Sequence, residues 1–356
     1  MELGPSKGAI RTAIELLASK RAVPSQLLEG CLNEIASGGA SDTQIGAFLM
    51  GLAMKGVEVD ELATIARWMR SRALPVRPKV YKELIDTCGT GGGALTFNVS
   101  TANAIAAAAA GIPVAKHGSR SISHGSGSAD VLEALGVNIN LTPRQAERLI
   151  EEVGFAFLYA PLFHPMMNKV LKHESELGVK TVFYTVIGPL INPAGVRRHV
   201  LGVYRKELVE PIAEVLAELG YARALVVHGL DGLDEISNVG PTLIAEVRDG
   251  RLRDTYVVEP EEMGVRKAKL SEIRPEEDNP KHNADIILRI FSGVERGARR
   301  DFLLVNLSGS LVVGGLAKDL RDGVELARSV IDSGAAMKKL NEVIKASRSV
   351  GGVDEA

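Results

Sequence analysis

The sequence predicts an α/β fold, with a small N-terminal α-helical domain and a larger α/β domain whose mostly parallel central sheet is flanked by helices. Two observations lead to this prediction. Residues 1–76 show helical periodicity and no strand signal, whereas from Leu84 onward short apolar runs alternate with amphipathic helical segments. The chain has 356 residues, 46% of them hydrophobic, which is enough to fill a large core.

The N-terminal domain is expected to be a bundle of short helices over residues 1–76. Ser41 and Gln44 have the spacing of a capping box, and apolar residues follow at helical intervals until Gly56. Residues 59–73 repeat the pattern, and Pro75 lies just beyond them. No strand is predicted in this part of the chain.

Strands and helices are expected to alternate in the second domain, residues 77–356. A short strand is expected to begin at Leu84 and to lead into a glycine loop, and further strands are expected at residues 113–116, 137–141, 155–160, 200–204 and 223–229. The expected helices lie at residues 100–111, 128–136 with Ser128 as cap, 142–154, 207–220 and from about 283 to the end. Asp249-Gly250 between two strand-like runs indicates a hairpin, and the charged segment 266–280 is expected to be a loop.

Composition excludes several classes of protein. The formal net charge of -2, from 42 basic and 44 acidic residues, argues against a general nucleic-acid coat. Two cysteines form no disulfide framework. The N-terminus lacks the apolar core of a signal peptide, and no apolar run reaches membrane-spanning length. We therefore expect a soluble cytoplasmic protein.

A glycine loop, Asp86 to Gly93, lies between a predicted strand and a predicted helix. Glycines at such a junction let backbone N–H groups approach an anion, and the helix N-terminus adds its positive dipole end. Asn98, Ser100 and Thr101 supply side-chain donors beside it. The spacing fits neither the dinucleotide-binding pattern nor the Walker loop. The sequence thus predicts an anion site of another type.

A second candidate segment follows the strand that ends at Lys116. Ligands of α/β sheets bind at the carboxyl ends of strands, and a lysine there can pair with phosphate. The loop that follows is rich in hydroxyl donors, namely Ser121, Ser123, Ser126 and Ser128. This segment is expected to hold part of the same anion.

Asp234 and Glu235 follow the strand at 223–229. In a loop, both carboxylates can approach one hard cation, and Mg²⁺ favours one or two carboxylates together with phosphate oxygens. The sequence shows no Ser-His-acid order and no dense cluster of metal ligands. The pair is therefore expected to bind Mg²⁺ together with a phosphorylated ligand.

In this order the segments resemble the anthranilate phosphoribosyltransferase family. The similar segments, between about residues 35 and 345, are "SDTQIGAFLMGLAMKG", "GTGG", "FNVSTANA", "VAKHG", "SGSADVLEALG", "GPLINPAG", "LGVY" and "DEIS". The family fold is shared with nucleoside phosphorylases of the pyrimidine type. The resemblance implies a homodimer joined through the helical domain, to which residues 164–182 would return as a hinge.

The resemblance also implies the donor 5-phosphoribosyl-1-diphosphate with Mg²⁺ as cofactor. The implied donor-binding residues are Gly89, Thr90, Gly91, Gly92, Gly93, Thr96, Asn98, Ser100, Thr101, Lys116, Ser123 and Ser128. The implied metal-binding residues are Ser100, Asp234 and Glu235. Diphosphate would be displaced from ribose C1 by an aromatic amine, anthranilate by default, as in tryptophan biosynthesis. No acid or base is assigned, because the attacking amine is already neutral.

The sequence departs from the family pattern mainly on the acceptor side. The implied acceptor-binding positions are His117, Ser119, His164 and Glu174. The family has asparagine where this chain has Ser119, and an arginine that pairs with the anthranilate carboxylate where it has Glu174 or, counted from the other side, Ser175. The glycine loop is also one residue shorter, with Gly93 in place of the usual aspartate.

Three alternatives stay open at this point. One is a transferase of the same fold that acts on another aromatic or heterocyclic acceptor. Another is a nucleoside phosphorylase, which the pair Asp234-Glu235 disfavours because a metal suits a diphosphate donor. The third is a non-catalytic relative that binds nucleic acid, which the near-neutral charge disfavours.

Overall fold

The computed structural model describes residues 8–121 and 125–350. It divides into two compact units, one formed by the chain up to Leu74 with His164–Ile191, the other by Pro75–Phe163 with the chain from Asn192 onward. The sequence placed the first boundary at residue 76 and the returning segment at 164–182. The returning segment of the structure is longer and ends at Ile191.

The first unit is helical throughout its described residues. Its helices are α1 (Ala9–Ala18), α2 (Ser25–Ser37), α3 (Asp42–Lys55), α4 (Val59–Arg70), α9 (Met167–Leu177), α10 (Val182–Thr185) and α11 (Ile187–Leu190). Ser41 and Gln44 form the expected capping box at the start of α3. Leu28, Phe48 and Ile65 are fully buried, so helices α2, α3 and α4 share one apolar core.

The second unit is built on a seven-stranded sheet in the order β3-β2-β1-β4-β5-β6-β7. Its strands are β1 (Ile85–Asp86), β2 (Val114–Gly118), β3 (Phe155–Tyr159), β4 (Arg198–Gly202), β5 (Arg223–Gly229), β6 (Thr242–Arg248) and β7 (Arg251–Val258). The first five strands in this order pair in parallel, and β6 and β7 are antiparallel. Asp249 and Gly250 join β6 to β7 with φ angles of 50° and 66°, which confirms the expected hairpin.

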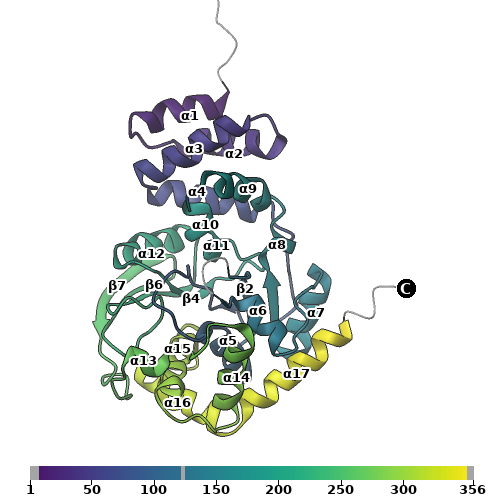
Figure 1. The fold of residues 1–356 in the computed structure, drawn as a ribbon, viewed down its shortest axis with the longest axis vertical. Helices are drawn as coiled ribbons and strands as arrows, with labels where there is room; N and C mark the ends of the chain where they lie inside the picture. Colours follow the sequence, from purple (N-terminus) through teal and green to yellow (C-terminus); the bar gives the residue numbers. More distant parts are fainter. Residues whose placement is uncertain (1–7, 122–124, 351–356) are drawn as a thin grey trace, which may run out of the picture. The chain divides into compact units, whose positions relative to one another are not determined.

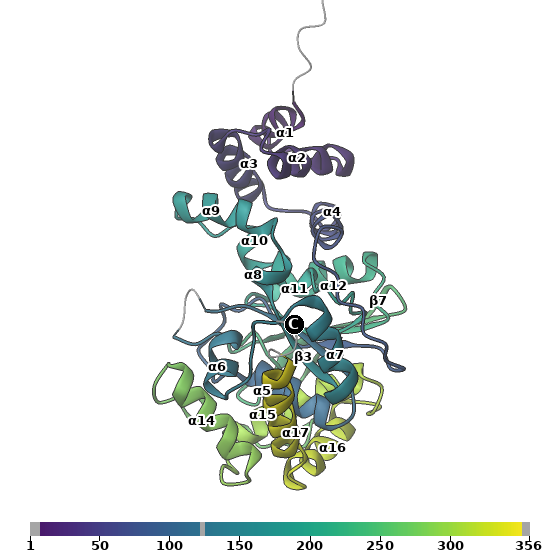
Figure 2. The same cartoon turned by 90° about the vertical axis from the view of Figure 1, so that its right-hand side faces the viewer.

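Helices cover both faces of this sheet (Figure 1). They are α5 (Val99–Ala109), α6 (Ser128–Ala134), α7 (Pro143–Val153), α8 (Ala160–Phe163), α12 (Val209–Glu218) after a 3-10 turn at Lys206–Leu208, α13 (Leu270–Ile273), α14 (Pro280–Phe291), α15 (Ala298–Val313), α16 (Leu320–Asp332) and α17 (Ala335–Val350). Helix α12 packs on β5, β6 and β7, whereas α5 and α15 pack on each other and on β2 and β4 (Figure 2). The expected α/β architecture is therefore confirmed.

Three local predictions were wrong. The segment 266–280, expected to be a loop, contains the helix α13, Leu270–Ile273. Residues 137–141 form no strand, because the backbone N–H and side-chain amide of Asn138 bond to Ser347 of α17 instead of a neighbouring strand. Ser128 is the first residue of α6 and does not cap it. The carboxylate of Asp130, three residues into the helix, accepts the N–H of Gly127 at 2.9 Å and closes this end of the helix.

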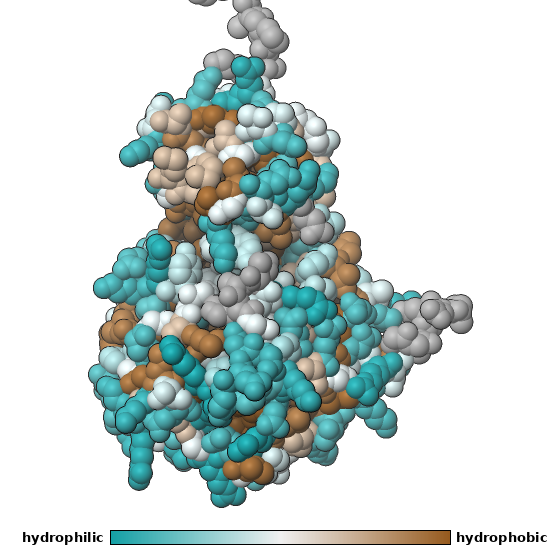
Figure 3. Space-filling view, in the orientation of Figure 1, coloured by the Kyte–Doolittle hydropathy of each residue, from teal (hydrophilic) through white to brown (hydrophobic). Residues whose placement is uncertain are grey.

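The surface of the α/β unit is mainly hydrophilic on the face seen in Figure 3, with only small apolar patches. Large exposed apolar side chains of this unit, such as Leu230, Val257 and Val294, lie in separate segments of the chain. Among the residues that the structure describes, no helix is both long and apolar enough to cross a membrane.

Candidate active site

The predicted donor and metal segments meet at one edge of the sheet. Strand β1 ends at Asp86 and leads into the glycine loop, β2 carries Lys116, and β5 ends at Gly229 before the turn with Asp234 and Glu235. Since β1, β2, β4 and β5 run parallel, their carboxyl ends lie at the same edge. This edge is where α/β sheets bind ligands.

The glycine loop is tied down at both ends by neighbouring segments. The N–H of Thr90 donates to the carbonyl oxygen of Gly202 at the end of β4, 2.9 Å away. The hydroxyl of Thr90 accepts the N–H of Tyr204 at 3.1 Å. Further along, the N–H of Ala94 donates to the carbonyl oxygen of Gly232 at 2.8 Å. These bonds use loop groups that flank the glycines and hold the loop between β4 and the turn after β5.

The glycine N–H groups themselves are left for a ligand. In the described part of the chain, the amides of Gly89, Gly91, Gly92 and Gly93 donate no hydrogen bond. Gly91 and Gly92 have φ angles of +65° and +90°, which only glycine adopts without strain. Successive amides in such conformations form a concave anion-binding nest. The loop therefore has the geometry and the unused donors of an anion site.

The N-terminus of α5 lies beside this loop, and the helix begins at Val99, one residue before the predicted start. The hydroxyl of Thr87 donates to the carbonyl oxygen of Ser100 at 3.0 Å. The hydroxyl of Thr101 is buried and has no partner among the described residues. The side-chain amide of Asn98 donates to the carbonyl oxygen of Ser126 at 3.2 Å, so its nitrogen anchors the serine-rich loop.

Lys116 is almost completely buried, with 1% of its surface exposed. Its Nζ lies 3.4 Å from the hydroxyl oxygens of both Thr87 and Ser100. Burial lowers the pKa of Lys116, and the charge of Asp86 acts in the opposite direction. A buried ammonium whose hydrogen bonds go to hydroxyl groups gains strongly from an anionic ligand.

Asp234 and Glu235 are brought directly against the glycine loop. A side chain on Gly93 would collide with the carboxylate of Asp234, and one on Gly202 would collide with its carbonyl oxygen. Oε1 of Glu235 accepts the hydroxyl of Thr96 at 3.3 Å, whereas Oε2 is buried without a partner in the described residues. Burial, and then the neighbouring charge of Asp234, raise the pKa of Glu235.

This donor set fits Mg²⁺. A buried carboxylate oxygen without a partner is satisfied by a cation, and Glu235 supplies one beside Asp234. The described residues contain no group of three or more His, Cys, Asp or Glu side chains that could hold a metal alone. Mg²⁺ suits such a sparse set, because it completes its coordination with water and substrate phosphate oxygens.

The serine-rich loop is placed next to the end of β2. A Cβ on Gly118 would come within 3.3 Å of Ser128 Cβ, so the start of α6 packs against this strand. The carbonyl oxygen of Ser119 accepts the N–H of Ala129 at 3.2 Å, and the side chain of Ser119 is exposed. The predicted donor ligand Ser123 lies outside the described residues.

The four acceptor-side residues fall in different units. His117 and Ser119 belong to the α/β unit, where His117 is buried and donates its N–H to Asp86. His164 and Glu174 belong to the helical unit. Burial lowers the pKa of His164 to about 4, so its imidazole is neutral at physiological pH.

The carboxylate of Glu174 is hydrogen-bonded to a residue of the same helical unit. Its Oε1 accepts the N–H of Thr181 at 2.8 Å and also the hydroxyl of Thr181, which is the N-cap of α10. Burial raises the pKa of Glu174, against the effect of these two bonds. In the structure, the carboxylate thus joins the end of α9 to the start of α10.

Sequence reasoning missed three buried polar residues around the glycine loop. Asp86, Asn192 and His199 are each no more than 1% exposed. The imidazole Nε2 of His199 lies 2.8 Å from the carbonyl oxygen of Cys88, and Asp86 bonds to Asn192. Asp86 had a sequence signal as a charged residue within an apolar run that leads into the glycines, and Asn192 lies in the family-like segment "GPLINPAG".

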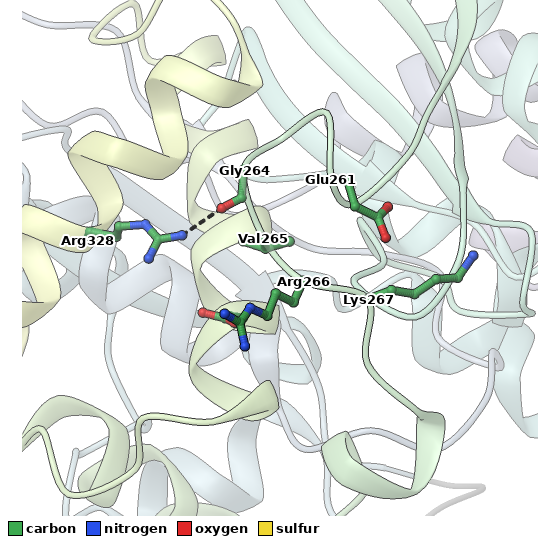
Figure 4. Close-up of a pocket in the computed structure, with 7 residues that line it drawn as sticks. Glu261, Gly264, Val265, Arg266, Lys267 and Arg328 are labelled. Carbon is green, nitrogen blue, oxygen red and sulfur yellow. Dashed lines mark hydrogen bonds between the residues drawn. The ribbon is translucent and has the colours of Figure 1, made fainter.

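A separate cavity of about 540 Å³ lies away from these residues (Figure 4). It is lined by Glu261, Gly264, Val265, Arg266, Lys267, Asp301 and Arg328. Its charges largely balance, and Nη2 of Arg328 donates to the carbonyl oxygen of Gly264 at 2.8 Å. None of the predicted site residues lines it, so it is not the site described above.

Comparison with protein families covers both units. Residues 11–73 match the helical bundle domain of the glycosyl transferase family, and residues 81–337 match the α/β domain of that family. The second match alone spans more than half of the chain. Both matches agree with the division of the structure into a helical and an α/β unit.

Individual proteins are similar over nearly the whole chain. An anthranilate phosphoribosyltransferase of Thermoanaerobacter sp. (strain X514) is 46% identical over 340 residues, 95% of this chain and 99% of that protein. The crystal structure of anthranilate phosphoribosyltransferase from Thermus thermophilus superposes with a TM-score of 0.88 at 38% identity, covering 96% of this chain and 100% of the other. The structure of the Saccharomyces cerevisiae enzyme in complex with 5-phosphoribosyl-1-diphosphate (PRPP) and Mg superposes with a TM-score of 0.86 at 28% identity. It covers 97% of this chain and 99% of the yeast chain.

Proposed function

The chain belongs to the anthranilate phosphoribosyltransferase family, and from this premise we propose that it transfers the 5-phosphoribosyl group of PRPP to the amino group of anthranilate. The observation that carries the proposal is the glycine loop, whose amides at Gly89, Gly91, Gly92 and Gly93 have no acceptor in the described residues. A rigid loop with unused amides suits the multiply charged diphosphate of this donor.

The donor-binding residues divide by chemistry. The glycine amides bind the diphosphate, with Thr90 and Thr96 fixing the loop around it. Lys116 contributes the buried positive charge, and Ser100 and Thr101 contribute hydroxyls at the start of α5. Asn98, Ser123 and Ser128 complete the proposed set, Asn98 by holding the serine-rich loop.

Asp234, Glu235 and Ser100 would hold Mg²⁺, which neutralises charge on the departing diphosphate when bound. The unpartnered Oε2 of Glu235 supports this assignment. The structural yeast relative is described with PRPP and Mg. The hydroxyl of Thr96 orients the carboxylate of Glu235 by a hydrogen bond. The backbone of Gly202 packs closely against the carbonyl oxygen of Asp234 and so positions the turn that carries both carboxylates.

The reaction breaks the bond between ribose C1 and the diphosphate oxygen and forms a bond from C1 to the acceptor nitrogen. Diphosphate leaves with the bonding electron pair, and the nitrogen loses one proton to solvent after attack. Because the transition state carries positive charge on the ribose ring, catalysis depends on orienting the reactants and stabilising the leaving group. No acid or base residue is needed for the neutral amine.

The proposed acceptor-binding residues are those that the family resemblance implies, His117 and Ser119 in the α/β unit and His164 in the helical unit. Position 174, where the family resemblance implies an arginine, carries a carboxylate that bonds to Thr181. This chain must therefore bind the anthranilate carboxylate without that arginine fork.

The remaining expectations belong to the same proposal. We infer a homodimer joined through the helical unit, on the strength of the family resemblance. We also expect the protein to work in the cytoplasm on small molecules, and the names of the relatives support a role in tryptophan biosynthesis. A net charge of -2 supports the absence of nucleic acid as a partner.

Ligand-dependent stabilisation tests this function. A ligand that binds only the folded state stabilises it, so the melting temperature of the protein should rise when PRPP and Mg²⁺ are added. It should rise further when anthranilate is added in the presence of diphosphate. Inorganic phosphate with a nucleoside should give no turnover. Stabilisation and turnover with phosphate and nucleoside, but none with PRPP, would instead identify a phosphorylase.

A further inference from the structure

Four hydrogen-bond donors converge on the buried carboxylate of Asp86. Its Oδ1 accepts the N–H groups of Thr87 at 2.7 Å, Cys88 at 3.1 Å and His117 at 3.2 Å. Its Oδ2 accepts the side-chain amide of Asn192 at 2.7 Å. The side chain of Asp86 has no exposed surface, so water does not replace any of these bonds.

The strand lengths explain why a side chain is required here. Strand β1 has only two residues and pairs with β2 through Ile85 and Val114. Strand β2 continues to Gly118, so the N–H of His117 has no strand partner on the side of β1. Asp86 supplies that acceptor and also receives the first two amides of the glycine loop. One carboxylate thus fixes the loop relative to the strand that carries Lys116.

Asn192 is matched to this role. Its Nδ2 donates to Asp86 and to the carbonyl oxygen of Ala115 at 2.8 Å, and its Oδ1 accepts the N–H of Ala194 at 2.9 Å. Both amide hydrogens are therefore used, and only asparagine or glutamine offers this combination of donors and acceptor. Asn192 is 1% exposed and is the first residue of the α/β unit after the returning segment.

We propose that Asp86 and Asn192 form a positioning pair that holds the glycine loop in the conformation that binds the phosphoribosyl donor. The inference rests on the proposed function, since the donor is the ligand concerned. Three of the four groups that Asp86 accepts from, the N–H groups of Thr87, Cys88 and His117, belong to the glycine loop or to the strand that carries Lys116. Neither side chain contacts the donor, because all the polar atoms of both are directed to protein partners.

The test compares Asp86→Asn and Asn192→Ala with the wild-type enzyme by calorimetric titration with PRPP in Mg²⁺. Asp86→Asn keeps the shape of the side chain but loses its charge, and the new amide nitrogen, a donor, lies opposite the donor Nδ2 of Asn192. We therefore expect the Kd of PRPP to rise about 10- to 100-fold. Asn192→Ala should weaken PRPP in the same direction by less. The KM for anthranilate should stay within about twofold of wild type in both variants. Hydrogen exchange should accelerate in residues 84–95 and stay unchanged in β5.

Glu61→Gln is the matched control in the helical unit. Glu61 is also a buried carboxylate, 2% exposed, and accepts the N–H groups of Val23 and Glu58, each at 2.9 Å. This variant should lower the melting temperature and leave the Kd of PRPP unchanged. If Asp86→Asn and Asn192→Ala behave like this control, the pair is merely structural and the inference is wrong. If Asp86→Asn does not fold, Asn192→Ala alone decides. Wild-type protein that binds no PRPP would overturn the proposed function itself.

Discussion

The carboxylate of Asp86 and the side-chain amide of Asn192 are joined by a hydrogen bond of 2.7 Å across 106 residues of sequence. This bond links the end of the central strand β1 to the segment that re-enters the α/β unit. It lies beneath a glycine loop whose own amides are unused. The polar side-chain atoms of Asp86 and Asn192 are therefore all hydrogen-bonded to protein, whereas the glycine amides are available to an anion.

Removing the Asp86 carboxylate altogether should be strongly destabilising. In Asp86→Ala, three backbone amides and the Asn192 amide lose their acceptor in a buried place, and we expect the free energy of unfolding to fall by at least about 3 kcal/mol. Urea denaturation measures this change. Asp254→Ala, at an exposed carboxylate of β7, should change it by no more than about 0.5 kcal/mol. A fall of less than about 1 kcal/mol in Asp86→Ala would contradict the account.

Gly202→Ala should weaken the metal site. The new Cβ would collide with the carbonyl oxygen of Asp234 and displace the turn that carries both carboxylates. We expect the Mg²⁺ concentration for half-maximal activity to rise about tenfold or more, and titration of Mg²⁺ measures it. In Gly46→Ala the nearest atom to the new Cβ is 3.7 Å away, so this control should keep the wild-type requirement. Equal Mg²⁺ requirements in both variants would rule out this role of Gly202.

Lys116→Met should weaken binding of PRPP without lowering the thermal stability of the protein. Methionine fills a similar volume without a charge, so relief from burial of the ammonium should maintain or raise the melting temperature. The KM for PRPP should rise about 100-fold, because a buried cation that faces the phosphates is lost. Thermal unfolding and steady-state kinetics on the same preparation measure both. A variant with wild-type KM for PRPP would show that Lys116 does not bind the donor.

Glu174→Gln should raise stability at neutral pH. Burial raises the pKa of Glu174 in the folded state above its ordinary value of 4.5, so the stability linked to this group is complete below pH 4.5 and is lost as the pH rises through the folded pKa. Glutamine stays uncharged and still accepts from Thr181. The variant should therefore melt a few degrees higher than wild type at pH 7, with a difference that shrinks toward pH 4.5.

Melting temperatures between pH 4 and pH 8, roughly the range over which carboxylates with raised pKa titrate, provide this measurement. Glu176→Gln, at an exposed carboxylate two residues along α9, should reproduce the wild-type profile. A Glu174→Gln variant that melts below wild type by the same amount at every pH would instead mean that the charged carboxylate stabilises the unit.

Residues whose role depends on local chemistry could be predicted from the sequence. The glycine loop, Lys116 at the end of a strand and Asp234-Glu235 after another strand were found because glycine runs, strand ends and paired carboxylates are local patterns. Parallel strands then bring them to one edge. The alternation of strands and helices predicted the α/β unit for the same reason.

Residues whose role depends on distant partners could not be predicted. Asn192 is defined by Asp86 and Ala115, and His199 by Cys88, contacts that exist only once the strand order is known. The apolar alternation of residues 137–141 suggested a strand, but Ser347 of α17 takes the bonds of Asn138. The sequence pattern did not reveal that β1 would be so short that a carboxylate must replace its missing hydrogen bonds.

The most direct test of the central claim is a turnover measurement with PRPP, Mg²⁺ and anthranilate, in which released diphosphate and N-(5-phosphoribosyl)anthranilate are quantified together. The account predicts equal amounts of the two products, with no release of diphosphate when either anthranilate or Mg²⁺ is omitted. Failure to form the N-phosphoribosylated product, or release of diphosphate at the same rate without anthranilate, would contradict it.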